Sequence, residues 1–216
     1  MMNDETRMRK RASRLFRSSD FGTPSSLNIR HSSFRAEGAF TIIELLVVIT
    51  IIVILAGLIL STIGYVQKKG ARARAEAEIA AMSAALESYK ADNGIYPRDA
   101  TNQYTDTLNA KSNTDASQSV YQNASLFLFT RLSGLNADQT AIAGAKSYFT
   151  FKPQMLGGTR DANGNVNPVT YIRDPFGNSY GYSTAYQADS SKGYNPTFDL
   201  WSTANSTDAN QWIKNW

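Results

Sequence analysis

The sequence predicts an α+β protein in which one long N-terminal helix packs on a small antiparallel β-sheet domain. Three observations lead to this prediction: a 22-residue run without any charge, a stretch of helical periodicity directly after it, and four short strand-like runs in the second half of the chain. A length of 216 residues accommodates one such domain with an N-terminal appendage.

The first 38 residues form a basic leader. They hold eight Arg or Lys and four acidic residues, whereas residues 39–216 hold 14 of each sign and have no net charge. The leader is rich in Ser and lacks apolar clusters, so it cannot bury enough surface to offset the entropy of ordering, and we expect it to be disordered. The single His is His31, and the chain has no Cys. Ser-His-Asp and Cys-His catalysis, thiolate zinc sites and imidazole metal sites are therefore excluded beyond the leader.

A membrane-spanning helix is expected over residues 40–66. Between Gly38 and Gln67 the only charged residue is Glu44, and residues 45–66 hold none. About 20 apolar residues suffice to cross a bilayer as a helix. The run is too long for the apolar core of an ordinary secretory signal, which has roughly 7–15 residues.

The helix is expected to continue as a stem over residues 67–94. This stretch contains no Pro and is rich in Ala, Arg, Glu and Lys, which are strong helix formers. Four apolar residues recur at helical spacing and form one stripe: Ile79, Met82, Leu86 and Tyr89. Asp92-Asn93-Gly94 supplies a left-handed stop, with Pro97 beyond it. One continuous helix is therefore predicted from Phe40 to Asp92.

The remaining residues, 95–216, predict a globular α/β domain that ends in a loop. Residues 101–119 are polar and predict a long surface loop. Residues 120–135 predict a short amphipathic helix with Gly134 in its last turn. Four strand-like runs follow, separated by Gly, Asn, Asp and Pro: Ser147–Lys152, Val169–Arg173, Ser179–Thr184 and Thr197–Ser202. They predict a small antiparallel sheet, and the stem stripe is the expected cover of its apolar face.

Glu44 is the most informative single residue. A carboxylate near the start of a lipid-embedded helix costs a few kcal/mol on insertion scales. One interpretation is that it lies at the headgroup boundary and is solvated. The other is that it has a cationic partner, and residues 39–67 contain no cation. A new α-amine, made by cutting the chain just before the apolar run, would supply one.

The start of the apolar run resembles the class III signal of type IV pilins and of the pseudopilins of type II secretion. The residues are Gly38-Ala39-Phe40-Thr41-Ile42-Ile43-Glu44-Leu45-Leu46-Val47-Val48-Ile49. The resemblance implies that prepilin peptidase removes the leader, residues 1–39, on the cytoplasmic side and methylates the new N-terminal Phe40. Cutting after Ala39 makes Glu44 the fifth mature residue, and cutting after Gly38 makes it the sixth. We favour the cut after Ala39, because the spacing from Phe40 to Glu44 places the amine against the carboxylate.

Three later segments resemble the major pseudopilins of the type II secretion system, in that family's order. They are Tyr89-Lys90-Ala91-Asp92-Asn93-Gly94-Ile95-Tyr96-Pro97, Asp174-Pro175-Phe176-Gly177-Asn178-Ser179-Tyr180-Gly181-Tyr182, and Phe198-Asp199-Leu200-Trp201-Ser202 with the ending Ile213-Lys214-Asn215-Trp216. Residues 174–177 also read as a plain β-turn between strands.

The resemblance implies a pilin-like fold and a structural role with no catalysis. It implies a helical homo-oligomeric filament, in which Glu44 meets the amine of a neighbouring Phe40. The implied partners are prepilin peptidase, minor pseudopilins, the inner-membrane assembly platform and membrane lipid. The implied location is the bacterial inner membrane, crossed once, with the C-terminal domain in the periplasm and with later assembly into the pseudopilus.

Major pseudopilins bind calcium in the loop after the Asp-Leu-x-Ser segment. The resemblance carries that site over to the Leu200 carbonyl, the Ser202 hydroxyl and the Asp208 carboxylate. This chain departs from the family pattern at Ala204-Asn205-Ser206 and at Asn210, which removes charged oxygens that raise calcium affinity. A second loop, residues 161–165, imitates the start of an EF-hand but has Ile172 where Glu is needed, so it reads as a turn.

Two other functions fit the residues. A type IV pilin of a surface filament is the alternative within the filament class, although the chain has no Cys pair to close a pilin's C-terminal loop. A monomeric, membrane-anchored periplasmic binding protein or hydrolase could use paired carboxylates drawn from Asp161, Asp174, Asp189, Asp199 and Asp208. The lack of net charge over residues 39–216 predicts no nucleic-acid binding.

Overall fold

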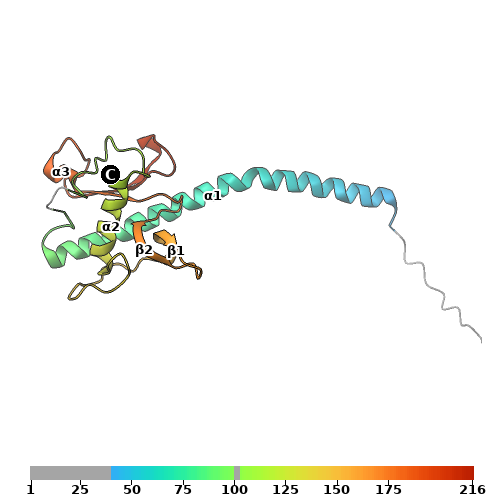
Figure 1. The fold of residues 1–216 in the computed structure, drawn as a ribbon. Helices are drawn as coiled ribbons and strands as arrows, with labels where there is room; N and C mark the ends of the chain where they lie inside the picture. The colour runs from blue at the N-terminus through green and yellow to red at the C-terminus, as the bar shows by residue number, and fades with distance from the viewer. Residues whose placement is uncertain (1–39, 100–102) are drawn as a thin grey trace, which may run out of the picture. The chain divides into compact units, whose positions relative to one another are not determined.

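The computed structural model describes residues 40–99 and 103–216 (Figure 1). The chain divides into two compact units, one that ends at Thr50 and one that comprises Ile51–Trp216. Three helices occur in the described residues, α1 (Ile42–Asn93), α2 (Ser119–Ser133) and the short α3 (Ala185–Ala188), with two 3-10 turns, η1 (Pro153–Met155) and η2 (Ala209–Gln211). The leader lies outside the described residues, so its predicted disorder stays a prediction.

Helix α1 confirms the long helix predicted from Phe40 to Asp92, with its bounds shifted by two residues at the start and one at the end. It stops at Gly94, whose φ of 78° is the left-handed conformation that glycine adopts without steric cost. The Gly94 amide donates a hydrogen bond to the Lys90 carbonyl at 2.7 Å, which closes the last turn. The predicted stop signal is therefore confirmed.

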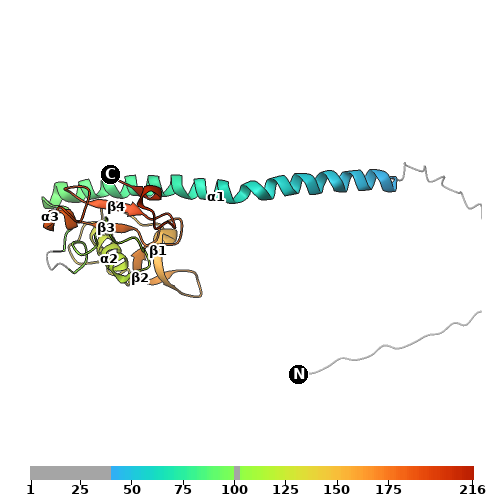
Figure 2. The ribbon, with the colours of Figure 1, turned by 90° about the horizontal axis from the view of Figure 1, so that it is seen from above.

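Five short strands in the described part of the chain form two antiparallel sheets. Strands β1 (Leu156–Arg160) and β2 (Val166–Ile172) form a bulged hairpin. Strands β3 (Gly181–Ser183), β4 (Asp199–Ser202) and β5 (Ile213–Lys214) form the second sheet in the order β3-β4-β5. In Figure 2, β3 and β4 lie between the C-terminal half of α1 and α2. The prediction of small antiparallel sheet structure is confirmed, but the prediction of one four-stranded sheet is wrong.

The predicted strand at residues 147–152 does not form. The amides of Tyr148 and Phe149 both donate to the Leu132 carbonyl, at 2.8 and 3.0 Å, so this segment attaches to the end of α2 instead of to a sheet. Two strands, β1 and the two-residue β5, were not predicted. Strand β1 contains Gly157, which strand propensity disfavours. A Cβ at Gly157 would lie 2.4 Å from the Tyr171 ring, so the close approach of that ring requires glycine there.

Most of the core is one apolar cluster that joins α1, α2 and both sheets. From α1 it takes Ala75, Ile79, Met82, Ala85 and Leu86, and Tyr89 is partly buried against it. The predicted stem stripe is therefore confirmed as the cover of the sheet domain. Helix α2 confirms the helix predicted over residues 120–135, and it ends at Gly134 as expected.

The predicted surface loop at 101–119 is corrected over its described residues, 103–119. Leu108, Ala110 and Ala116 are buried in a second cluster with Trp201 and Trp212. Polar groups of this loop are buried because they have partners. The hydroxyl of Thr184 donates to Asp106 at 2.6 Å, and that of Ser183 donates to the Leu108 carbonyl at 2.6 Å. A low apolar content indicated exposure, but satisfied hydrogen bonds allow these polar residues to lie inside.

Candidate assembly site

The apolar N-terminal part of α1 is exposed along its whole length. Every residue from 40 to 70 is exposed, and Phe40 at its start is 83% exposed. The helix is long and apolar enough to cross a membrane. An exposed apolar surface of this extent marks a membrane or protein contact.

Thr41 and Glu44 form a reciprocal cap at the start of α1. The Thr41 amide donates to Glu44 Oε2 at 2.8 Å, and the Thr41 hydroxyl donates to the same oxygen at 2.8 Å. In return, the Glu44 amide donates to Thr41 Oγ1 at 3.3 Å. This is the capping box, in which Ser or Thr is followed three residues later by Glu or Gln.

The cap gives Glu44 a structural role that was not predicted from the sequence, although the pattern Thr-x-x-Glu indicates a capping box. The carboxylate completes the first turn of its own helix, so it has partners before any second subunit is present. Its position next to Phe40 also suits a meeting with the α-amine that cleavage before Phe40 would create. Any test of Glu44 must therefore separate its charge from its capping bonds.

The predicted cleavage residues are only partly described. Gly38 and Ala39 lie outside the described residues. Phe40 and Thr41 precede the first helical residue, Ile42. The cut and the methylation stay predictions.

Polar contacts fasten the stem half of α1 to the domain. The Tyr180 hydroxyl donates to Glu78 Oε2 at 2.8 Å, and Arg74 Nε lies 2.7 Å from Glu78 Oε1. Burial, together with the nearby Glu78, raises the pKa of Tyr180, so its hydroxyl stays protonated and donates. Further toward the N-terminus, Arg72 Nη1 donates to the Gln211 carbonyl at 2.8 Å.

Two of the predicted calcium ligands, Leu200 and Ser202, lie on β4, and Asp208 precedes the 3-10 turn η2. Each ligand atom has a partner inside the protein: the Leu200 carbonyl accepts from the Asn215 amide at 3.2 Å, the Ser202 hydroxyl donates to Asp174 Oδ2 at 2.5 Å, and Asp208 Oδ1 accepts from the Asn210 amide at 2.9 Å. Within the described ranges, no group of three or more His, Cys, Asp or Glu side chains could hold a metal ion. Ca²⁺ takes six to eight oxygens, so the three predicted ligands alone would not complete its coordination. Calcium binding stays a prediction.

Asp174 organises the turn that the sequence predicted. The Gly177 amide donates to the Asp174 carbonyl at 3.1 Å, which confirms the β-turn. Asp174 Oδ1 accepts from the amides of Phe176 and Asn178, at 3.0 and 2.8 Å. Burial raises the pKa of the Asp174 carboxyl, and these bonds with that from Ser202 oppose the rise.

Four of the five acids of the hydrolase alternative lie in turns or loops, whereas Asp199 begins strand β4. Each accepts at least one backbone N–H within four residues of itself: Asp161, Asp174, Asp189, Asp199 and Asp208. For the four loop acids these are Asx bonds, the ordinary use of Asp in loops. Asp199 instead accepts from the amides of Tyr194 and Asn195, in the segment that leads into β4.

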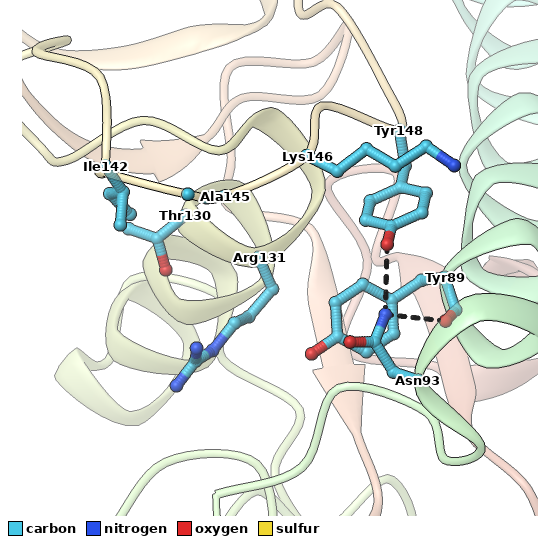
Figure 3. Close-up of a pocket in the computed structure, with 9 residues that line it drawn as sticks. Tyr89, Asn93, Thr130, Arg131, Ile142, Ala145, Lys146 and Tyr148 are labelled. Carbon is cyan, nitrogen blue, oxygen red and sulfur yellow. Dashed lines mark hydrogen bonds between the residues drawn. The ribbon is translucent and has the colours of Figure 1, made fainter.

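A polar pocket of about 230 Å³ lies between the end of α1, α2 and the loop that follows α2 (Figure 3). Asn93 Nδ2 donates to the Tyr148 hydroxyl at 3.0 Å and to the Tyr89 carbonyl at 2.8 Å. The rings of Tyr89 and Tyr148 pack edge to face, 5.2 Å apart. Lys146 Nζ pairs with Asp92 Oδ2 at 2.5 Å. The pocket holds none of the predicted site residues, and its contacts join the end of the stem to the domain.

Comparison with known proteins finds two curated relatives of one name. The chain is 38% identical over 66 residues to the type II secretion system core protein G of Pectobacterium carotovorum subsp. carotovorum, which is 31% of this chain and 42% of that protein. It is 38% identical over 74 residues to the protein of that name from Aeromonas hydrophila, which is 34% of this chain and 50% of that protein. The chain thus spans about half the length of the curated relatives it matches. No family model and no solved structure matches it.

Neither relative is named as an enzyme, a type IV pilin or a binding protein, so the two alternative functions are not favoured. The relatives and the long, exposed apolar helix agree with the signal and the later segments of the sequence. The resemblance of this chain to the major pseudopilins of type II secretion is thereby confirmed.

Proposed function

We propose that this protein is a structural subunit of the pseudopilus of a type II secretion system. It assembles with further copies of itself through the apolar N-terminal part of α1 into a helical filament. The filament helps to drive folded proteins across the outer membrane, and the subunit itself performs no catalysis.

One observation carries the proposal: residues 40–66 are predominantly apolar, with Glu44 as their one charged residue, and all of them are exposed. Lipid covers this surface while the subunit is stored in a membrane. The same residues of neighbouring subunits cover it in a filament. Both surroundings are apolar, so the transfer from one to the other costs little hydrophobic free energy.

The proposed location follows from the same segment. The helix anchors the subunit in the inner membrane, with residues 67–216 in the periplasm. Prepilin peptidase removes residues 1–39 on the cytoplasmic side and methylates Phe40. The minor pseudopilins and the inner-membrane assembly platform then act on the mature subunit.

Intact-mass and N-terminal peptide measurements on the membrane-bound protein test maturation. The expected N-terminus is Phe40, with one added methyl group on its amine. An N-terminus at Ala39 would move the cut by one residue, and a full-length chain that keeps its leader would contradict the proposed maturation.

The sheared filament fraction after overproduction tests assembly. We expect the mature protein in that fraction, as well as in the membrane pool. A protein confined to the membrane, with correct maturation, would contradict the proposed filament role.

A further inference from the structure

We propose that Lys68 and Lys69, together with Tyr65, form a surface that binds the phosphate headgroups of anionic lipids. This inference rests on the proposed function, because it takes residues 40–66 to lie in a bilayer. It adds a specific contact between the stem and the membrane surface.

The three residues lie on one face of α1. They stand at positions i, i+3 and i+4, which neighbour each other on a helix surface. Tyr65 is 72% exposed, and both lysines are exposed. The aromatic ring and the two ammonium groups thus share a single accessible face.

The two lysines are the first cations after the apolar run, and they differ from the next two. Arg72 donates to the Gln211 carbonyl at 2.8 Å, and Arg74 lies 2.7 Å from Glu78. No hydrogen bond or ion pair engages Lys68 or Lys69 among the described residues of the chain. Both arginines are already bonded within the protein, Arg72 to the domain and Arg74 to Glu78 of its own helix, whereas the lysine charges remain available to an external anion.

Their position identifies the anion. The uncharged run ends at Val66, so the next turn of the helix lies at the depth of the headgroups. Tyr is enriched at that depth, because its ring is apolar and its hydroxyl is polar. Lipid phosphates are the anions concentrated there, and an ammonium group binds phosphate as a point charge.

The distribution of charge along the chain supports a dedicated role. Cations close to a span favour the cytoplasmic side, yet Lys68 and Lys69 lie on the side of the domain. In the proposed orientation they work against correct insertion. A contact with the outer phosphates of the inner membrane offsets that disadvantage and holds the span at a defined depth.

The test measures lipid selectivity of the mature, full-length protein in vesicles. Spin-labelled phosphatidylglycerol and spin-labelled phosphatidylcholine are compared by the share of each that the protein immobilises. We expect about threefold enrichment of phosphatidylglycerol for the wild type. We expect nearly equal shares for the Lys68→Gln/Lys69→Gln variant. The control, Arg131→Gln/Lys152→Gln, removes the same charge from exposed side chains of the domain and should match the wild type.

Two further arms separate the possible failures. Inorganic phosphate should weaken the enrichment no more than sodium chloride of equal ionic strength, since specific loss in phosphate would indicate a site for the free anion and contradict the lipid contact. Flotation with the vesicles checks insertion. A chain that does not float would overturn the membrane anchor itself. If the chain inserts but the wild type and the lysine variant show the same enrichment of phosphatidylglycerol, only this inference is overturned.

Discussion

At the scale of single residues, Asp174 shows how a buried carboxylate can serve structure without catalysis. Its oxygens accept from two backbone amides and from the Ser202 hydroxyl. Burial raises its pKa above the ordinary value of 3.8. The folded state therefore binds this proton more tightly than the unfolded chain does. This carboxyl lowers stability progressively as pH rises from about 4 through its folded pKa.

The variant Asp174→Asn should be more stable than the wild type at pH 7, with an advantage that shrinks toward pH 4. The amide oxygen can accept the two backbone N–H groups, and its NH₂ group can donate to Ser202. Thermal unfolding at several pH values measures the difference. Asp174→Ala is the matched control, which loses the turn bonds and should cost about 1–3 kcal/mol at every pH. A constant difference between Asp174→Asn and wild type across this range would contradict the assigned role of burial.

Glu44 combines two properties that the sequence shows separately, a charge in an apolar segment and a place in a capping box. Its charge in an apolar segment singled it out from the sequence. Its bond to Thr41 was equally predictable, because Thr-x-x-Glu before an apolar run is the pattern of a capping box. A residue with one conspicuous property can hold a second role in its own helix.

At the scale of elements, strong periodicity was predictable and short strands were not. The stem stripe and the helix after residue 118 repeat apolar residues over several turns, which favours one local structure. Strand β1 and the irregular segment at 147–152 are decided by long-range contacts, with the Tyr171 ring and with the Leu132 carbonyl. Composition over six residues cannot carry that information.

The stem stripe gives a quantitative test at this scale. Met82 is fully buried between α1 and the domain, so Met82→Ala should lower the free energy of unfolding by about 2–5 kcal/mol. Ala84→Gln, on the exposed face of the same helix, should change it by less than about 0.5 kcal/mol. Denaturant unfolding followed by near-ultraviolet circular dichroism measures both. Equal effects at the two positions would mean that the stripe does not hold the stem to the domain.

At the scale of the whole molecule, two kinds of apolar surface coexist. Residues 75–216 bury theirs in two internal clusters, whereas residues 40–66 leave theirs exposed. The sequence predicted this division, because an uncharged run of 22 residues differs sharply from an amphipathic stem. It did not predict the second cluster, in which a polar loop closes over Trp201. Hydrogen bonds with distant residues allow this polar loop to be buried, and no local sequence pattern predicts them.

Calcium should have at most a small effect on the stability of this molecule. Only one of the three predicted ligands is a carboxylate, and all three ligand atoms have partners in the protein. We expect the melting temperature of the mature protein to rise by less than about 3 °C when calcium replaces chelator. Magnesium at equal concentration is the control. A larger, calcium-specific rise would mean that the loop rearranges around the ion.

We propose that Glu44 meets the amine of a neighbouring Phe40 when subunits assemble. Three variants separate charge from capping. Glu44→Gln keeps a capping side chain but loses the charge, Glu44→Ala loses both, and Thr41→Ser keeps both. Losing the carboxylate leaves a buried amine unpaired, which is the costly half of the change. Membrane insertion should persist in all three: the two Glu44 variants remove a charge from an apolar helix, which favours insertion, and Thr41→Ser leaves the charge unchanged.

The sheared filament fraction, normalised to the mature membrane pool, is the deciding measurement. We expect a wild-type fraction for Thr41→Ser and a loss of at least about tenfold for both Glu44→Gln and Glu44→Ala, since leaving one buried charge unpaired costs more than about 1.4 kcal/mol. A wild-type fraction from Glu44→Gln, with loss only in Glu44→Ala, would show that assembly needs the helix cap and not the charge, and would contradict the pairing of Glu44 with Phe40.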